Sequence, residues 1–502
     1  MILGQEENKK IEKLKLSLFL EKDYIFFKKG IQVITKLKEE ETLDNFRIAK
    51  DTLGEVKVPK EAYYGAQTQR AVENFPISGI RLPFSFIKAQ AIIKKSAAFA
   101  NKECKALDDK KANAIMTAAD EIINGEMRDQ FVVDAYQAGA GTSQNMNMNE
   151  VLASRAFELL GGEKGDYSLI HPNDDVNMSQ STNDTIPTAI QISIAMELQA
   201  TLYPALSRLI QVLKKKEIQF HEIIKAGRTH LQDAVPIRLG SEFKGYRGTL
   251  ESVERTLKHS ETFLYELGLG GNAVGTGINA HPDYAELAIK QIAQTTDLPF
   301  TQSKNTYAFM QNTNAAIRVS GHLKELAIHL IKISSDLRLL SSGPRTGFAE
   351  IMLPAVQPGS SIMPGKINPV ILENLYMICS QVIGNDACVS TAAIGSQLEI
   401  NAMMPVIGFN VLQSIKILSN GITIFTEKCL KDITANEENI QNWLEQSLSL
   451  VTALNPHIGY EKAAAVAKES FETGKTLKEV LESKKILSRE EIDRILDPNS
   501  MI

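Results

Sequence analysis

The chain has 502 residues, and its 55 Lys and Arg against 60 Asp and Glu give a formal net charge of −5. Hydrophobic residues make up 43% and charged residues 23%, which is ordinary globular usage and excludes an intrinsically disordered chain. The mild acidity argues against a nucleic-acid-binding protein, which would need a basic face. At about 150 residues per domain, the length predicts about three domains.

Cysteine usage and hydropathy predict a cytoplasmic protein. The four cysteines, Cys104, Cys379, Cys388 and Cys429, form no CxxC pair and are too few for a disulfide framework. No apolar run reaches the length of a membrane span, so we expect no membrane partner. The apolar patch near the N-terminus is interrupted by charges and lacks a small-residue cleavage site, which argues against a secretory signal.

The first segments along the chain differ in character. Residues 1–43 alternate Lys and Glu clusters with apolar patches, which would fit an amphipathic helix or a loosely attached N-terminal extension. Residues 44–182 mix turns with helices, and we expect an N-terminal domain there. Within it, residues 86–103 are rich in Ala and Lys and contain no Gly or Pro. They are predicted to be helical, as are residues 112–123.

The central segment, residues 183–435, gives the clearest structural signal, because its apolar residues recur at helical spacing. Two stripes comprise Leu323, Leu326, Leu330, Ile333, Leu337 and Leu340, and Leu198, Leu202, Leu206, Leu209 and Leu213. A third helix is expected to begin with Asn368 as its N-cap and Pro369 in its first position. Its apolar positions include Leu372, Leu375, Cys379 and Val382. Such helices are made to pack on other helices and predict a bundle.

The remaining segment, residues 436–502, returns to short helices and is expected to form a small C-terminal helical domain. Strand patterns with a period of two are scarce along the chain. The predicted fold class is therefore all-α, with a long central bundle between two smaller domains.

Several segments resemble nucleotide-binding or metal-binding motifs but do not match them. Residues 359–366 (GSSIMPGK) resemble a phosphate-binding loop, but have five residues between the glycines and then Ile367 where Ser or Thr is needed. The Gly-rich residues 268–277 follow a helical stretch rather than a strand, and residues 474–476 lack the upstream glycine. The eight histidines are scattered and form no HExxH motif, so we predict no catalytic metal.

Three separated patches share one chemical character. They comprise residues 139–150 (GAGTSQNMNMNE), residues 179–184 (SQSTND) followed by 227–236 (GRTHLQDAVP), and residues 359–369 (GSSIMPGKINP). Each combines hydroxyls and side-chain amides with glycines, and Arg228, His230 and Lys366 add cations or a titratable ring. Hydroxyls, amides and one or two cations are what a site needs to bind small carboxylates.

Simpler interpretations exist for each patch taken alone. SQSTND consists of common capping residues, His230 would ordinarily be a buried histidine with satisfied partners, and Lys366 would be a surface lysine. The third patch is harder to explain in this way, because packing alone does not account for its combination of residues. Loops of that specificity usually carry function.

The third patch is also where the chain resembles a known family. It matches the signature loop of the fumarase/aspartase superfamily, GSSxMPxKxNP, at every defined position, and the resemblance extends from about residue 44 to residue 495. Residues 141–150 (GTSQNMNMNE), 70–78 (RAVENFPIS), Thr182 and Val370 are of the aspartase type.

Other positions depart from that type. Residues 269–277 carry the double glycine of fumarases, and Asn272 replaces the Thr usual in both branches. Asn314 stands where aspartases usually carry Asp or Gly. Class II fumarase, which hydrates fumarate to malate, therefore stays open as an alternative, as does a non-catalytic structural helical protein.

The resemblance implies reversible deamination of L-aspartate to fumarate and ammonia, by anti-elimination through an aci-carboxylate intermediate. Ser360 would be the base, with Lys366 and the loop amides stabilising its alkoxide. One carboxylate would be held by Thr142, Ser181 and Thr182, the other by Lys366, Asn368 and Thr229, while Asn183 and His230 would contact the amino group and Ser361 would also bind substrate. A fumarase would also need a general acid for the hydroxyl group, and His230 is a candidate for that role.

The resemblance further implies a homotetramer in which the central helices form one shared bundle. The three loops of each site would then come from three different subunits. The small dicarboxylate or amino-acid substrate would be the main partner. No cofactor would be required, although a divalent cation could act as an activator.

Overall fold

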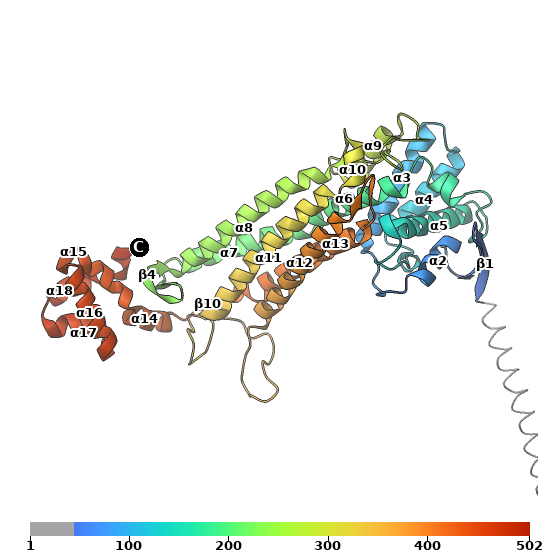
Figure 1. Ribbon diagram of the computed structural model, residues 1–502. Coiled ribbons are helices and arrows are strands. Elements are labelled where there is room, and N and C mark those ends of the chain that lie inside the picture. The colour runs from blue at the N-terminus through green and yellow to red at the C-terminus, as the bar shows by residue number, and fades with distance from the viewer. Residues whose placement is uncertain (1–44) are drawn as a thin grey trace, which may run out of the picture.

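The computed structural model describes residues 45–502, and the N-terminal extension expected at residues 1–43 lies outside the described residues. The described chain is elongated, with a cluster of helices at one end, a long bundle in the middle and the C-terminal helices at the other end (Figure 1). Within residues 45–502, no helix is both long enough and apolar enough to cross a membrane.

The cluster at the N-terminal end begins with a β-hairpin, which the sequence patterns did not predict. Strands β1 (Phe46–Asp51) and β2 (Gly54–Pro59) pair antiparallel, with Phe46 opposite Pro59. The helices that follow are α2 (Ala66–Asn74), α3 (Phe84–Glu103), α4 (Asp109–Ile123) and α5 (Thr142–Leu159). The helices α3 and α4 confirm those expected at residues 86–103 and 112–123.

The longest helical element in residues 45–502 is made of three consecutive pieces. It comprises α6 (Thr182–Glu197), a π-helical turn (Leu198–Leu202) and α7 (Tyr203–Gln219), with helical backbone angles at both junctions. At 1.5 Å per residue this run is roughly 55 Å long. The predicted stripe from Leu198 to Leu213 is completely buried along it, which confirms that prediction.

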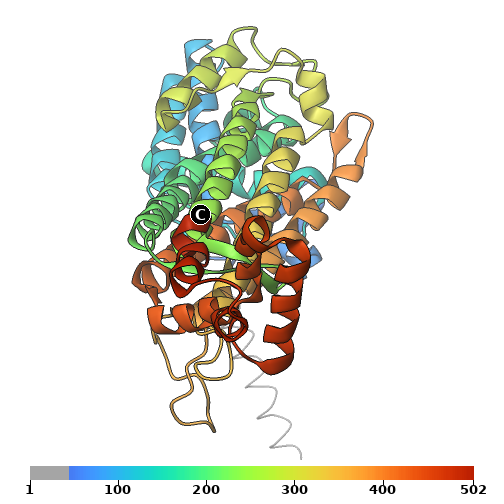
Figure 2. The same cartoon turned by 90° about the vertical axis from the view of Figure 1, so that its left-hand side faces the viewer.

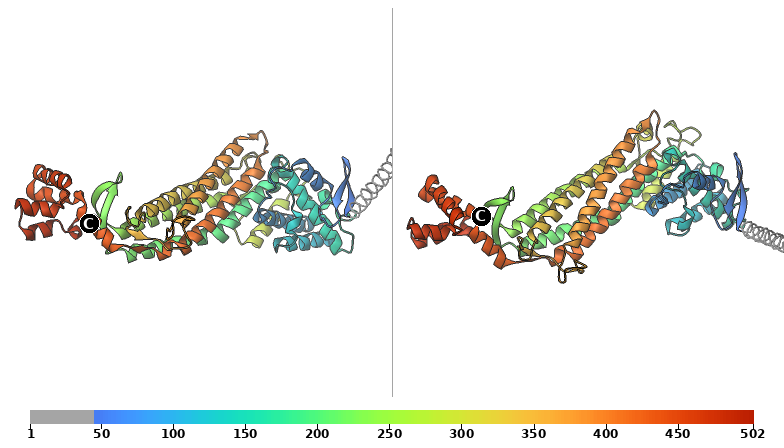
Figure 3. Two further views of the ribbon diagram at one scale, coloured as in Figure 1. Left: turned by 90° about the horizontal axis from the view of Figure 1, so that it is seen from below. Right: turned by 60° about the horizontal axis from the view of Figure 1, so that its bottom comes forward.

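Four further long helices complete the bundle and run alongside this element (Figure 3). They are α8 (Leu239–Glu261), α11 (Asn314–Leu340), α12 (Val370–Ile394) and α13 (Met404–Lys428). The predicted stripe from Leu323 to Leu340 is buried on α11, and the four apolar positions predicted on α12 are buried as well. The helical bundle is therefore confirmed.

The predicted start of α12 is wrong in one detail. The helix begins at Val370, so Pro369 itself occupies the capping position, and no side chain caps the helix. The Asn368 side chain instead donates a hydrogen bond to the carbonyl oxygen of Gly359, at 2.6 Å. Asn368 therefore closes the preceding loop.

Short elements connect these helices and cover their ends. They are β3 (Ile224–Thr229) with β4 (Gln232–Arg238), β5 (Glu266–Leu267) with β6 (Thr301–Gln302), β7 (Ile351–Met352) with β10 (Thr434–Ala435), β8 (Ser396–Gln397) with β9 (Ile400–Asn401), and the helices α9 (Tyr284–Thr296) and α10 (Thr306–Gln311). Each sheet in the described chain has two strands. The mostly helical fold class is thus confirmed.

The C-terminal helices form a group seen in front of the bundle in Figure 2. They are α14 (Glu437–Gln446), α15 (Asn455–Ile458), α16 (Tyr460–Thr473), α17 (Leu477–Lys484) and α18 (Arg489–Ile495). A small apolar core joins this group to Ala226 of β3, whereas one large core runs through the N-terminal helices and the bundle. The predicted domain limits at 182 and 435 stay a prediction.

Candidate active site

The first group of predicted site residues lies where α5 and α6 begin. Thr142 is the first residue of α5, and it follows Gly141, whose φ of 83° favours glycine. A Cβ at Gly141 would also lie 3.1 Å from the side chain of Ile186, on α6. The glycine therefore allows the start of α5 to approach α6 closely.

Ser181, Thr182 and Asn183 form the beginning of α6. Ser181 is the N-cap: its hydroxyl accepts a hydrogen bond from the Asn183 backbone, and Asp184 completes a capping box. The capping interpretation of SQSTND is therefore correct for Ser181. The cap uses the N–H groups of Asn183 and Asp184, but the positive end of the dipole of a long helix still favours a carboxylate beside this turn.

A hydrogen bond joins these two helix starts. The side-chain amide of Asn145, on α5, donates to the hydroxyl of Thr182 at 3.2 Å. Asn145 also donates to the Asn177 side chain, which accepts a 2.8 Å hydrogen bond from the buried Lys94 ammonium. Asn145, Asn177 and Lys94 were not among the predicted residues, and their signal was only a cluster of amides in the sequence.

Asp184 connects the start of α6 to the Gly-rich loop at residues 268–277. Its buried carboxylate accepts backbone hydrogen bonds from Ser181 at 2.9 Å and from Gly270 and Asn272 at 3.0 Å. Burial raises the pKa of Asp184 to about 6. The backbone N–H groups of Gly270 and Asn272 therefore tie the Gly-rich loop to the start of α6.

Thr229 and His230 lie at the tip of the β3–β4 hairpin, and both are exposed. The interpretation of His230 as an ordinary buried histidine is therefore wrong. His230 and Leu231 form the two-residue turn with φ of 55° and 59°, a left-handed conformation that is costly for residues with a side chain. Strain of this kind is concentrated at functional sites.

Ser360, Ser361, Lys366 and Asn368 lie in the long loop between β7 and α12. The loop is closed by the Gly359 N–H, which donates to the Lys366 carbonyl at 2.8 Å, in addition to the Asn368 bond described above. The hydroxyl oxygen of Ser360 accepts hydrogen bonds from the backbone N–H groups of Ile362 at 3.3 Å and Met363 at 3.0 Å. Donors aimed at an oxygen favour its anionic form, as a base would need.

The predicted residues fall into two groups at opposite ends of the bundle. The structure brings Thr142, Ser181, Thr182 and Asn183 together at one end. The hairpin and the loop lie near each other at the other end (Figure 1). The helical run from Thr182 to Gln219 separates the two groups by roughly 55 Å. One chain therefore does not bring all the predicted site residues into one place.

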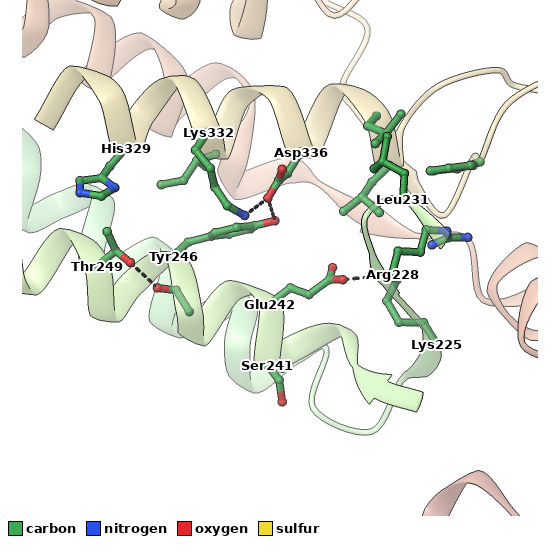
Figure 4. A pocket seen from close by; sticks show the side chains of 15 residues that line it. Lys225, Arg228, Leu231, Ser241, Glu242, Tyr246, Thr249, His329, Lys332 and Asp336 are labelled. Atoms are coloured by element: carbon green, nitrogen blue, oxygen red, sulfur yellow. Dashed lines mark hydrogen bonds and ion pairs between the residues drawn. The ribbon is translucent and has the colours of Figure 1, made fainter. Parts of the chain in front are cut away.

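A buried group of charges lies beneath the hairpin, and apart from Arg228 its members were not singled out in the sequence. Glu350 is completely buried and pairs with Arg228 at 2.7 Å and with Lys225 at 3.1 Å. The group borders a cavity of about 500 Å³ between α8 and α11 (Figure 4). Glu350 belongs to no motif in the sequence, so no local pattern could have indicated that it forms these ion pairs.

Within residues 45–502, no three His, Cys, Asp or Glu side chains gather in a way that could hold a metal ion. The predicted site residues at the two ends of the bundle carry hydroxyls, amides, an imidazole and an ammonium group. This donor set suits carboxylates better than metal ions.

Comparison with known protein families matches most of the chain. A family model described as lyase matches residues 54–384, and one described as the fumarase C C-terminus matches residues 450–502. The first match includes the starts of α5 and α6, the β3–β4 hairpin and the loop with Ser360. All the predicted site residues therefore lie within it.

Curated relatives of two activities are equally similar. Aspartate ammonia-lyase of Bacillus subtilis is 49% identical over 456 residues, covering 91% of this chain and 96% of that protein. Class II fumarate hydratase of Thermosynechococcus vestitus is 49% identical over 448 residues, covering 89% and 96%. Overall identity therefore does not distinguish the two activities.

Solved structures have the same fold. The cobalt-bound fumarate lyase:delta crystallin of Brucella melitensis superposes with a TM-score of 0.88 at 47% identity, covering 91% of this chain and 99% of that chain. The class II fumarase of Schistosoma mansoni gives a TM-score of 0.88 at 39% identity, with the same coverage.

Proposed function

This chain belongs to the fumarase/aspartase superfamily of lyases, and from that premise we propose that it deaminates L-aspartate reversibly to fumarate and ammonia. The hydrogen bonds on Ser360 are the observation that carries the proposed chemistry. Two backbone N–H groups already point at its hydroxyl oxygen, inside the loop that bears the superfamily signature. Preorganised donors of this kind stabilise negative charge without further rearrangement.

In the proposed mechanism, Ser360 removes the proton next to the substrate carboxylate as an alkoxide, and Lys366 supports that charge. The starts of α5 and α6 bind the carboxylate that becomes the aci form, through Thr142, Ser181 and Thr182. The positive ends of the two helix dipoles favour the second negative charge that develops there. Stabilising this dianion is the main task, because the proton removed is only weakly acidic.

The rest of the substrate would be held by the other predicted residues. Lys366, Asn368 and Thr229 bind the second carboxylate, Ser361 adds a hydroxyl, and Asn183 and His230 contact the amino group. The ammonium of aspartate departs as neutral ammonia and needs no acid. No cofactor takes part in this mechanism, and a divalent cation could act only as an activator.

The preference for aspartate over malate rests on local sequence. The GTSQNMNMNE form of residues 141–150, together with Thr182 and Val370, is of the aspartase type. Class II fumarase is the second candidate, because the double glycine at Gly270 and Gly271 is of the fumarase type and fumarate hydratases are equally similar overall.

We propose that the active form is a cytoplasmic homotetramer. The distance of roughly 55 Å between the two groups of site residues supports this, because a complete site then requires more than one copy. Exposed apolar residues on the outer face of α12, among them Tyr376, Met377 and Ile394, would be covered in the shared bundle.

The reverse reaction tests the substrate directly. Purified protein is incubated with fumarate and ammonium in water, and the products are separated by chromatography. Aspartate is expected as the main product. Malate formed regardless of ammonium would establish the fumarase alternative, and no product at all would leave the non-catalytic alternative.

A further inference from the structure

Glu350 is an unusual residue, because it is a completely buried carboxylate outside the signature motifs. One oxygen accepts a hydrogen bond from the Arg228 guanidinium at 2.7 Å. The other forms an ion pair with the Lys225 ammonium at 3.1 Å, and Lys225 is buried as well. A buried charge persists in a fold when its partners are in place, because losing one of them leaves the other unpaired in a low dielectric.

The backbone of Glu350 is fixed on both sides. Its N–H donates to the Leu340 carbonyl, at the end of α11, at 2.9 Å. Its carbonyl accepts from the Asn436 N–H, just before α14, at 2.8 Å. Glu350 also directly precedes β7, from which the loop with Ser360 departs. Its carboxylate is therefore a fixed point at the root of that loop.

The hairpin on the other side of this contact has little support of its own. It is a sheet of two strands, and isolated two-stranded hairpins are marginally stable. Its register shifts between Ala226 and Gly227, and its turn residues have left-handed backbone conformations. A contact from outside the hairpin is needed to hold its tip in one place. On one strand, the Ser449 hydroxyl, from the C-terminal segment, donates to the Ala234 carbonyl at 2.5 Å.

Arg228 provides the contact on the other strand, where it directly precedes Thr229 in the sequence. Its guanidinium lies over the Phe348 ring, 4.2 Å from the ring centroid, in addition to its hydrogen bond with Glu350. The Arg228 side chain is 14% exposed. Without the carboxylate, a guanidinium at this depth would move towards water and displace the adjoining tip.

We infer that Glu350 is a positioning residue: through Arg228 it fixes Thr229 and His230, at the hairpin tip, relative to the root of the loop that carries Ser360. This inference rests on the proposed function, in which the tip binds substrate. Glu350 itself would not contact the substrate. Its effect would pass through Arg228 and would be lost with it.

The same cluster offers a matched control. Glu242, on α8, lines the same cavity (Figure 4) and forms an ion pair with the Lys225 ammonium at 2.9 Å. The Arg228 guanidinium pairs with Glu350 instead. Glu242→Gln therefore neutralises a carboxylate beside the same lysine and leaves the Arg228–Glu350 contact in place. A general effect of removing charge from the cluster would appear in both variants.

Hydrogen exchange tests the inference without any substrate. Amide exchange of residues 227–234 is measured by mass spectrometry in the wild type, Glu350→Gln and Glu242→Gln. We expect Glu350→Gln to exchange faster than the wild type at the tip. Glu242→Gln should exchange there at the wild-type rate, and the bundle helices of both variants should be unchanged. Unchanged exchange at the tip in Glu350→Gln would overturn the inference whether or not the protein is an aspartase.

A kinetic cycle tests the route through Arg228, using whichever reaction the wild type catalyses. We expect Glu350→Gln to lower kcat by at least about tenfold, since small misplacements of site groups are costly. Arg228→Gln should lower kcat by a similar factor. The kcat of the double variant should lie within about threefold of that of either single variant. Glu242→Gln should stay within about threefold of the wild type.

Additive losses in the double variant would show that Glu350 acts by another route and would overturn the inference. If Glu350→Gln does not fold, Arg228→Lys takes its place, because it keeps the charge and loses the planar fork. Faster exchange at the tip and a similar loss of kcat are then expected, and wild-type values would contradict the inference.

Discussion

The side-chain amide of Asn145 donates a hydrogen bond to the hydroxyl of Thr182 at 3.2 Å and so joins the first turns of α5 and α6. These two helix starts lie 40 residues apart in the sequence, and each combines hydroxyl side chains with the positive end of a helix dipole. Their junction makes one surface that suits a carboxylate. The base proposed for the same reaction, Ser360, lies at the opposite end of the bundle.

Ser360→Ala should abolish most of the turnover while leaving substrate binding nearly intact. We expect kcat to fall at least about a hundredfold, on the usual scale for a positioned base, with little change in KM. Steady-state kinetics and light scattering check this, and the assembly should be unchanged. A variant with near-normal kcat would place the base elsewhere, with Ser361 and His230 as the first residues to examine.

Lys366→Ala should damage binding and turnover together. Lys366 is proposed both to hold a substrate carboxylate and to stabilise the Ser360 alkoxide, so its removal affects the ground state and the transition state. A raised KM with a lowered kcat is expected in the same assay. If KM stayed at its wild-type value, Lys366 would not be a substrate ligand.

Mixing two inactive variants tests whether sites are shared between subunits. Thr182→Val alters one end of the bundle and Ser360→Ala the other, and each variant alone should lose most activity. The two variants are mixed in equal amounts, unfolded and refolded together. If each site takes these two residues from different subunits, about a quarter of the sites in the hybrids should have both residues intact and be active. No recovery in verified hybrid tetramers would contradict shared sites.

The titration of Asp184 should be visible in stability. Burial raises the pKa of Asp184 in the folded protein to about 6, from an ordinary value of 3.8. A raised pKa stabilises the fold at low pH, and this contribution is lost as the pH rises from about 4 through about 6. The free energy of unfolding of the wild type, compared with that of Asp184→Asn, should therefore fall by about 2 to 3 kcal/mol across this pH range.

Thermal unfolding of both proteins at several pH values measures that difference. The melting temperature of the wild type should decline relative to the variant as the pH rises through the window. A constant difference between the two curves would contradict the account of Asp184 as a buried carboxylate that ionises at a cost.

The helices could be predicted from the sequence more reliably than their arrangement. The stripe from Leu323 to Leu340 records the contacts of a single helix face, and periodicity reveals such local patterns directly. The β1–β2 hairpin was missed, although Val56 and Val58 alternate with polar residues as a strand requires. Its other strand leaves Phe46 and Ile48 exposed, so burial gives it a weak signature.

The candidate site was harder to assemble than the fold. The residue types in the three patches indicated carboxylate binding, but nothing in the sequence showed that the patches lie at opposite ends of a long helical run. The exposed position of His230 and the role of Asn368 in closing its loop depend on backbone geometry. Glu350 acquires its partners only through contacts between distant segments, which no local pattern records.

The ratio of kcat/KM for L-aspartate to kcat/KM for L-malate tests the proposed function most directly. The absorbance of fumarate is followed with both substrates under identical conditions, and ammonia is measured in parallel. The account predicts efficient turnover of aspartate, with equal amounts of fumarate and ammonia, and negligible turnover of malate. Ready dehydration of malate with aspartate inert would contradict it and identify the protein as a fumarase.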